Sequence, residues 1–207
     1  MTARLEHVYW IGGGSGAGKS TIALRLAARH GWSHFSTDAA MSDHARRSPS
    51  EDCPLLTKFL AMDMDERWVN RSPEAMFETF HWFRGEGFDR IVEDLVRLPA
   101  RPGVIVEGFR LIPRLVEPLL AAPNRAVWLL PTPDFRRAVF DRCGPRWGFL
   151  GMTSDPQKAL RNLLERDRLF TDHLREEAER LELTTIEVDS SMTEDDLAER
   201  VTEAFGL

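Results

Sequence analysis

Apolar and polar segments alternate along the chain, and together they predict strands and helices in turn. Val104-Ile105-Val106 is the clearest strand, because it is fully apolar and β-branched, as a buried parallel strand is. Similar short runs predict four more strands, at 8–11, 32–36, 126–130 and 184–188. The longer segments between them predict helices at 19–30, 39–47, 52–66, 73–97, 134–140, 155–181 and 193–205, and a helix after residue 108 that is broken around Pro113 and Pro118.

Glycines and capping residues mark the ends of these elements. Gly31 follows two basic residues and is the expected left-handed stop of the first helix. Ser72 is the expected cap of the helix that begins at 73, and Asp155 and Thr193 are the expected caps of the last two helices. Two glycines at 85 and 87 predict a break or a bend within 73–97.

Strands that alternate with helices predict a doubly wound parallel sheet with right-handed crossovers. The segment at about 40–98 is too long for a simple crossover, so we expect an inserted helical substrate-binding region above the sheet. A segment with glycines and arginines at about 142–156 is the expected lid. We therefore expect one α/β domain over residues 1–207, with its ligand at the C-terminal ends of the strands.

Composition narrows the class of partner. The formal net charge of −6 argues against a general nucleic-acid binder. The two cysteines have no metal-type spacing, which favours a reducing cytoplasm over a disulfide framework. No run approaches the length of a membrane span, and the first apolar run is too short for a signal peptide, so we expect no membrane partner. The oligomeric state stays open.

Residues 13–20 read Gly-Gly-Ser-Gly-Ala-Gly-Lys-Ser, a complete G-x-x-x-x-G-K-S phosphate-binding loop (P-loop) between a strand and a helix. Glycines let consecutive backbone N–H groups curl around a phosphate, and the following helix directs its positive end to the same place. A Gly-rich turn that binds nothing would need neither the lysine nor the hydroxyl. We expect nucleotide binding by Gly13, Gly14, Ser15, Gly16, Ala17, Gly18, Lys19, Ser20 and Thr21, with Lys19 on the β- and γ-phosphates and Ser20 on magnesium.

Two carboxylates follow predicted strands and so should face the same edge of the sheet. Asp38 is expected to orient, and to deprotonate, the hydroxyl that receives a phosphoryl group, although it could equally cap the next helix. Glu107 is expected to hold the magnesium shell or to bind substrate, and the alternative is an exposed carboxylate at a strand end. Gly108 beside it would allow a ligand to approach the backbone closely.

Arginines gather in the second half of the chain. Arg142, Arg146, Arg161 and Arg166 suit a lid that closes over the nucleotide, because a guanidinium matches the diffuse charge of a phosphoryl group in transfer. The alternative is a solvated charged face of a helix. We expect Arg161 and Arg166 to be the catalytic pair.

Aromatic residues crowd the inserted region around His81, and they form either a helix core or a substrate pocket with aromatic walls and one or two polar anchors. His81 taken alone indicates a packed or an exposed side chain. Candidate anchors for the acceptor are Arg46, Arg47, Arg84 and Arg110, beside Asp38 and Glu107.

The order of these motifs resembles the P-loop small-molecule kinases, a group that includes nucleoside monophosphate, shikimate, gluconate and 2-phosphoglycerate kinases and chloramphenicol phosphotransferase. The P-loop, Ser36-Thr37-Asp38 and Val106-Glu107-Gly108 carry the resemblance. It implies a three-layer fold with a five-stranded parallel sheet of order 2-3-1-4-5, and ATP with Mg²⁺ as phosphoryl donor. It also implies that Asp38 activates the acceptor, that Arg142 packs on adenine and that the loop at Asp189 borders the base.

The leading expectation is therefore an ATP-dependent kinase that transfers the γ-phosphoryl group to a hydroxyl of a small metabolite, nucleotide or antibiotic. Lys19, Asp38, Arg161 and Arg166 would be its catalytic residues, and Ser20 and Glu107 its magnesium ligands. One alternative is a nucleotide-dependent ATPase or switch module that acts on a protein partner. Another is a toxin-like kinase that acts on a nucleotide sugar.

Overall fold

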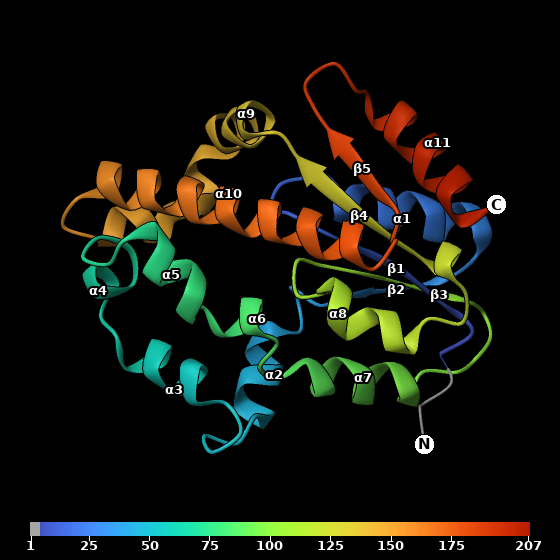
Figure 1. Ribbon diagram of the computed structural model, residues 1–207, viewed down its shortest axis with the longest axis horizontal. Coiled ribbons are helices and arrows are strands. Elements are labelled where there is room, and N and C mark those ends of the chain that lie inside the picture. Colours follow the sequence, from blue (N-terminus) through green and yellow to red (C-terminus); the bar gives the residue numbers. More distant parts are fainter. Residues whose placement is uncertain (1–4) are drawn as a thin grey trace.

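The computed structural model describes residues 5–207, with the side chains of 143–147 excepted. Its core is a sheet of five parallel strands in the order β2-β3-β1-β4-β5, which is the order typical of the P-loop NTPase fold. The predicted α/β fold class is therefore confirmed (Figure 1). The strands are β1 (Val8–Gly13), β2 (Ser33–Ser36), β3 (Val104–Glu107), β4 (Ala126–Pro131) and β5 (Thr185–Val188).

Helices cover both faces of this sheet, because its strands are apolar on both sides. Trp10 and Trp128 face a layer built from α7 (Phe88–Arg97), α8 (Pro113–Val116) and the long α10 (Pro156–Arg180). Their neighbours Ile11 and Leu129 face the opposite layer, built from α1 (Lys19–His30) and α11 (Glu194–Phe205). Short 3₁₀ turns at η1 (Glu117–Leu119) and η2 (Pro123–Arg125) lead back into β4.

The register of the strands sets where the chemistry sits. Ile11 of β1 and Ser36 of β2 both pair with Glu107 of β3. These three residues thus lie at one level of the sheet, and the segments that follow the three strands emerge side by side. The P-loop, Thr37-Asp38 and Gly108 are therefore neighbours, although about 90 residues separate the first from the last.

The inserted region contains more and shorter helices than the sequence predicts: α2 (Met41–Arg47), α3 (Pro54–Ala61), α4 (Met64–Trp68), α5 (Pro73–Thr79) and α6 (His81–Arg84). The expected helix 52–66 is split, because Met62 is extended and Asp63 caps α4 by accepting from the Glu66 N–H. Phe80 is likewise extended, and Gly85 and Gly87 are left-handed, so 73–97 becomes α5, α6 and α7.

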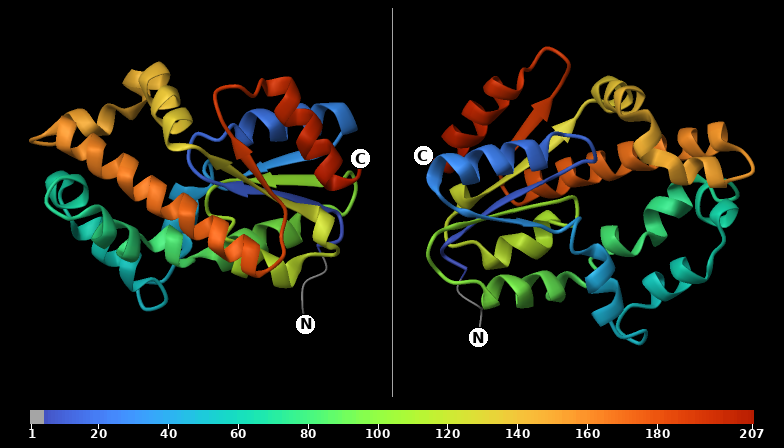
Figure 2. Two further views of the ribbon diagram at one scale, coloured as in Figure 1. Left: turned by 45° about the horizontal axis from the view of Figure 1, so that its top comes forward. Right: turned by 180° about the vertical axis from the view of Figure 1, so that it is seen from behind.

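The long helix α10 joins the insert to the sheet. Its Asn162 amide donates to the backbone oxygens of Trp68 and Val69 at 3.1 and 3.3 Å, where α4 ends. Further along, Phe170 stacks flat on Phe83 of the insert, with ring centroids 3.7 Å apart. Figure 2 shows α10 running between the insert and α9 (Pro133–Cys143), which continues into the 3₁₀ segment η3 (Gly144–Met152). The expected irregular lid thus has helical turns.

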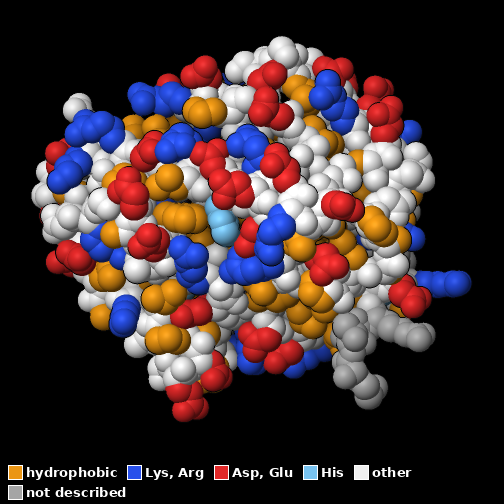
Figure 3. Space-filling model, in the orientation of Figure 1, with side chains coloured by type: hydrophobic (Ala, Val, Ile, Leu, Met, Phe, Trp, Pro, Cys, Tyr) orange, Lys and Arg blue, Asp and Glu red, His pale blue; other side chains and the backbone are white. Residues whose placement is uncertain are grey.

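The surface mixes charges of both signs with small apolar areas, as Figure 3 shows for one face. Over residues 5–207, no helix has both the length and the apolar composition needed to cross a bilayer.

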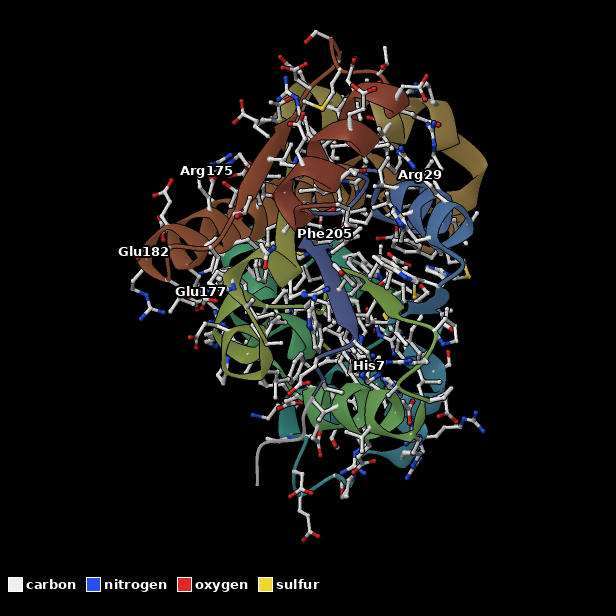
Figure 4. The ribbon with its side chains drawn as sticks, turned by 90° about the vertical axis from the view of Figure 1, so that its right-hand side faces the viewer. His7, Arg29, Arg175, Glu177, Glu182 and Phe205 are labelled. Carbon is white, nitrogen blue, oxygen red and sulfur yellow. The ribbon has the colours of Figure 1, made fainter. Side chains whose placement is uncertain are left out.

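Glu177 of α10 anchors this helix to α8 (Figure 4). Its carboxylate accepts from the Arg114 guanidinium at 2.7 Å, and His173 lies 3.1 Å away on the same helix. Burial alone would raise the pKa of Glu177, but the hydrogen bonds from His173 and Arg114 outweigh it and lower the pKa to about 2.

We predict that Glu177→Gln lowers the melting temperature at pH 7 by roughly 5 °C. A depressed pKa in the folded state stabilises the fold above the unfolded value of 4.5, and this contribution is lost as the pH falls toward 2. The wild type and the variant should therefore converge in acid, as differential scanning fluorimetry across pH would record. The exposed neighbour Glu176 provides the control, since Glu176→Gln should leave the melting temperature unchanged.

Candidate functional site

The P-loop is held against the sheet by its own glycines. Gly13 has φ +128°, and a Cβ there would lie 2.0 Å from the Leu129 oxygen of β4, so only glycine fits. The next amide, Gly14 N–H, donates to that oxygen at 3.0 Å. The Lys19 ammonium folds back and donates to the Gly14 oxygen at 2.7 Å. The loop is thus formed with its lysine already inside it.

Lys19 and two carboxylates share one buried cluster. Burial lowers the pKa of Lys19, while the nearby Asp38 and Glu107 carboxylates oppose the shift. Burial also raises the pKa of Asp38, with Lys19 pulling it down and Glu107 pushing it up. The structure thus brings together three of the residues that the sequence singled out.

Asp38 is fixed by the backbone around it. The Thr37 N–H donates to the backbone carbonyl oxygen of Glu107 at 2.9 Å. Gly108 has φ +146°, and a Cβ there would lie 1.8 Å from Thr37 Oγ1 and 2.9 Å from Asp38 Oδ1. The capping alternative for Asp38 is wrong, because Ala40 stands at the N-cap of α2 and no side chain caps that helix.

Glu107 is completely buried, so the alternative of an exposed strand-end carboxylate is wrong. Neither of its oxygens has a hydrogen-bond partner among the described residues, and the nearest cation-forming atom recorded is His34 Nε2 at 3.7 Å. A buried carboxylate without a partner is costly unless something pairs with it.

Magnesium fits this donor set. No group of three His, Cys, Asp or Glu side chains within residues 5–207 could cage an ion by itself. Magnesium is, however, commonly bound through one or two carboxylates together with phosphate oxygens and water. Glu107 and the Ser20 hydroxyl would contribute to such a shell, and the carboxylate oxygens of Glu107, which have no hydrogen-bond partner among the described residues, are the observation that fits it.

Arg110 supports Asp38 from behind. Its guanidinium donates to the Thr37 oxygen at 3.3 Å and to the Gly87 oxygen at 3.1 Å, and it contacts His44 Nδ1 at 2.8 Å. Burial lowers its pKa to about 10, with Asp38 opposing the shift. All these contacts are internal, so the guanidinium of this predicted substrate residue holds the backbone at Thr37, next to Asp38.

Arg166 lies in the cavity beside the P-loop, paired with its neighbour Asp167 at 2.8 Å. The same Asp167 carboxylate binds Arg136 of α9 at 2.7 Å, and all three side chains are buried. A Cβ on Gly16 would lie 3.5 Å from Arg136 Nη1, so this second guanidinium adjoins the loop. Arg136 and Asp167 were not among the site residues predicted from the sequence. The position of Arg136, five residues after the end of β4, was the available signal.

Other predicted residues lie elsewhere. Arg161 is exposed and lines a separate cavity of about 370 Å³ between α9 and α10, since five residues turn it away from the face that carries Arg166. Arg46 pairs with Asp43 in solvent. The exposed Arg84 binds the Glu78 oxygen, and Arg47 binds Asp43 and Asp94. Asp189, which was expected to border the base, accepts from the Ser191 N–H. Arg142 is exposed at the end of α9, and the side chain of Arg146 lies outside the described residues.

A cavity of about 610 Å³ lies next to the P-loop and Asp38. The P-loop from Ser15 to Thr21 and Asp38 form one end of it. The insert, the segment after β3, η3 and α10 supply the rest. The side chains away from the loop are Met41, Phe59, Trp68, Phe80, His81, Trp82, Phe83, Phe109, Phe149, Leu163 and Arg166.

No protein-family model and no curated protein sequence matches this chain. Among solved structures, an uncharacterized protein from Eubacterium ventriosum ATCC 27560 is similar, with a TM-score of 0.45 and 13% sequence identity over 96% of this chain and 97% of that chain. This likeness supports no statement about function. The fold class rests on the strand order and register of the sheet itself.

We predict that Asp38→Asn stabilises the free protein at pH 7, on the order of 1 kcal/mol. A carboxyl whose pKa is raised by folding costs stability as the pH climbs above its unfolded value of 3.8. The variant and the wild type should therefore melt alike near pH 3 and diverge as the pH rises. Urea denaturation at several pH values measures the difference. Asp43→Asn, at an exposed site, is the matched control, and an equal effect there would contradict the prediction.

Proposed function

We propose that this protein is an ATP-dependent phosphotransferase that moves the γ-phosphoryl group to a hydroxyl of a small molecule. The observation that carries the proposal is that the P-loop, Lys19 and Asp38 line one cavity, whose remaining walls come mainly from the helical insert, with further residues from the segment after β3, η3 and α10. A phosphoryl donor and an acceptor can meet only where both have room. A cavity with a phosphate cradle at one end and apolar walls beyond it provides that room.

The P-loop would bind the triphosphate through its backbone N–H groups and the N-terminus of α1. Lys19 would exchange the Gly14 oxygen for phosphate oxygens, which are stronger partners for an ammonium than a neutral carbonyl. Ser20 and Glu107 would hold the magnesium shell. The ion would neutralise charge on the β- and γ-oxygens.

Asp38 would receive the proton of the acceptor. In the reaction, the acceptor oxygen forms a bond to the γ-phosphorus while the bond to the β–γ bridging oxygen breaks, and ADP leaves with that electron pair. The proton of the hydroxyl passes to the Asp38 carboxylate and then to water. The raised pKa of Asp38 suits this role, because a stronger base accepts the proton more readily.

Arg166 and Arg136 would stabilise charge on the phosphoryl group in transfer. Both share the single carboxylate of Asp167, so the three side chains carry one net positive charge beside the loop. Their burial keeps that charge effective, because water does not screen it.

In an ATPase or switch module that acts on a protein partner, water at Asp38 would be the only phosphoryl acceptor needed. The apolar walls beyond Asp38 favour an organic acceptor over water, and hence the phosphotransferase.

We predict that Lys19→Ala lowers phosphoryl transfer by roughly 10²–10³-fold, since one charged donor to the developing phosphate charge is lost. ATP consumption with a panel of hydroxyl acceptors measures the rate, and circular dichroism checks the fold. Lys158→Ala, on the exposed start of α10, should retain full activity. An active Lys19→Ala variant would remove the P-loop from the mechanism.

We predict that Asp38→Asn retains ATP binding and loses transfer by roughly 10²–10⁴-fold. In the wild type, the rate should rise with pH through the raised pKa of Asp38 and then level off. Isothermal titration with a non-hydrolysable ATP analogue and single-turnover assays across pH separate binding from chemistry. A wild-type rate in the variant would rule Asp38 out as the base.

A further inference from the structure

We infer that the acceptor is an uncharged hydroxylated aromatic compound, a phenol or an aryl alcohol, and that it bears no phosphate or carboxylate. This inference rests on the proposed phosphotransferase function and names its substrate class. It follows from the walls of the cavity, from the engagement of every nearby arginine and from one unpartnered histidine.

Aromatic rings form most of the wall beyond the P-loop. They come from α3, α4, α6, the segment after β3 and η3, so five parts of the chain converge on this space. Within the wall, Phe59 lies edge-on to Trp68 and Phe80, with ring centroids 6.0 and 5.4 Å apart. Such walls favour a flat, apolar ring, which can stack or pack edge-to-face against them.

The cavity has little positive charge to offer an anionic acceptor. Lys19 belongs to the P-loop, and among the residues that the structure describes Arg166 is the only arginine in the lining. Arg166 is already paired with Asp167, and its guanidinium lies about 5 Å over the rings of Trp68, Phe80 and Phe83. Asp38 adds a negative charge at the point where the acceptor would react.

The other arginines near the insert are held by internal partners. Arg110 stacks on Trp82 at 3.9 Å and binds the backbone behind it. Arg67 donates to the Phe59 oxygen at 3.0 Å, and Arg71 donates to the Glu66 oxygen at 3.1 Å. A phosphate-bearing acceptor requires guanidinium groups that are free to clamp it in a bidentate way. Each of these three guanidiniums is already engaged by internal partners, so none of the three is placed to clamp a phosphate in this way.

His81 supplies the polar anchor. It is 2% exposed, it lines the cavity, and its Nδ1 atom has no hydrogen-bond partner in the described structure. Burial lowers its pKa to about 3, helped by the charge of Arg110, so the ring is neutral at pH 7. A neutral imidazole can donate to or accept from a hydroxyl or a carbonyl, but it cannot pair with an anion as a cation would.

A nucleoside fits this wall less well. A base presents several donors and acceptors along one edge, and each needs a partner when it is buried. Beyond the P-loop and Asp38, the polar groups of the described lining are His81, the engaged Arg166 and the indole N–H groups of Trp68 and Trp82. A ring with a single hydroxyl leaves fewer groups unsatisfied.

Matched ligands test the inference with the full-length protein. The acceptors are 2-naphthol, its carboxylated analogue 6-hydroxy-2-naphthoate, and uridine, each with Mg²⁺ and ATP. Transfer is followed by ³¹P NMR, and binding by quenching of tryptophan fluorescence, since Trp68 and Trp82 line the cavity. We expect kcat/KM for 2-naphthol to exceed that for the carboxylated analogue by at least about tenfold, because an unpaired charge is costly to bury.

The outcomes separate the two proposals. A preference for the carboxylated compound or for uridine would overturn the substrate class, even if ATP is consumed. Absence of any ATP-induced thermal shift would overturn the phosphotransferase proposal, whereas the fluorescence titration would still show whether the cavity selects neutral rings. Equal binding of all three compounds would overturn the inference.

His81→Leu tests the polar anchor. The variant should bind naphthalene as the wild type does and bind 2-naphthol about tenfold more weakly, because only the hydroxyl loses its partner. A merely structural role of His81 would weaken both ligands equally and so contradict the assignment. His30→Leu, at the far end of α1, is the matched control. If His81→Leu does not fold, the same comparison is made with His81→Asn.

Discussion

A buried ammonium between two carboxylates is the interaction on which this structure depends. An isolated Lys19 at this depth would give up its proton, and the field of Asp38 and Glu107 opposes that loss. The same two acids, so close together, carry one more negative charge than the lysine can balance. Under the proposed function, a magnesium ion and a triphosphate would supply the cation and the anion that this cluster faces.

The pairing of the strand backbones fixes where Glu107 and Asp38 lie. Glu107 is level with Ile11 and Ser36 because three parallel strands share one register. The close contact of Gly108 with Thr37 then sets the direction of Asp38. The sheet thus defines the reactive end of the cavity, while the helical insert defines its shape. The two parts meet along α10, so reactivity and selectivity belong to different regions of one chain.

Local sequence signals predicted the sheet edge well. Strand runs, the P-loop and the acids after strands are short-range patterns, and each points to the same edge by the rule for parallel sheets. The complete burial of Glu107 did not follow from its own segment, where an exposed carboxylate stayed the alternative. It follows from the strand order, which only the resemblance implied. The order β2-β3-β1 puts neighbours on both sides of β3.

Signals that depend on three-dimensional placement were harder to interpret. Arg161 and Arg166 look alike in sequence, and only the packing of α10 decides which one faces the cavity. The breaks at Met62 and Phe80 come from extended backbone at residues that have no breaking tendency of their own. Asp167 was hidden for a similar reason, since its partner Arg136 is 31 residues away.

That shared carboxylate has a mechanical consequence. Asp167 joins α10, on which it lies, to α9. One of its carboxylate oxygens accepts from Arg136 of α9, and the other accepts from its neighbour Arg166 on α10. Under the proposed function, a polyanion at the P-loop would compete with Asp167 for both guanidiniums. Loss of the Arg136 contact would weaken the joint between α9 and α10, whereas Arg166 and Asp167 are neighbours on α10 itself. Binding at the P-loop would thereby loosen the packing of α9 against α10, and release of the product would restore it.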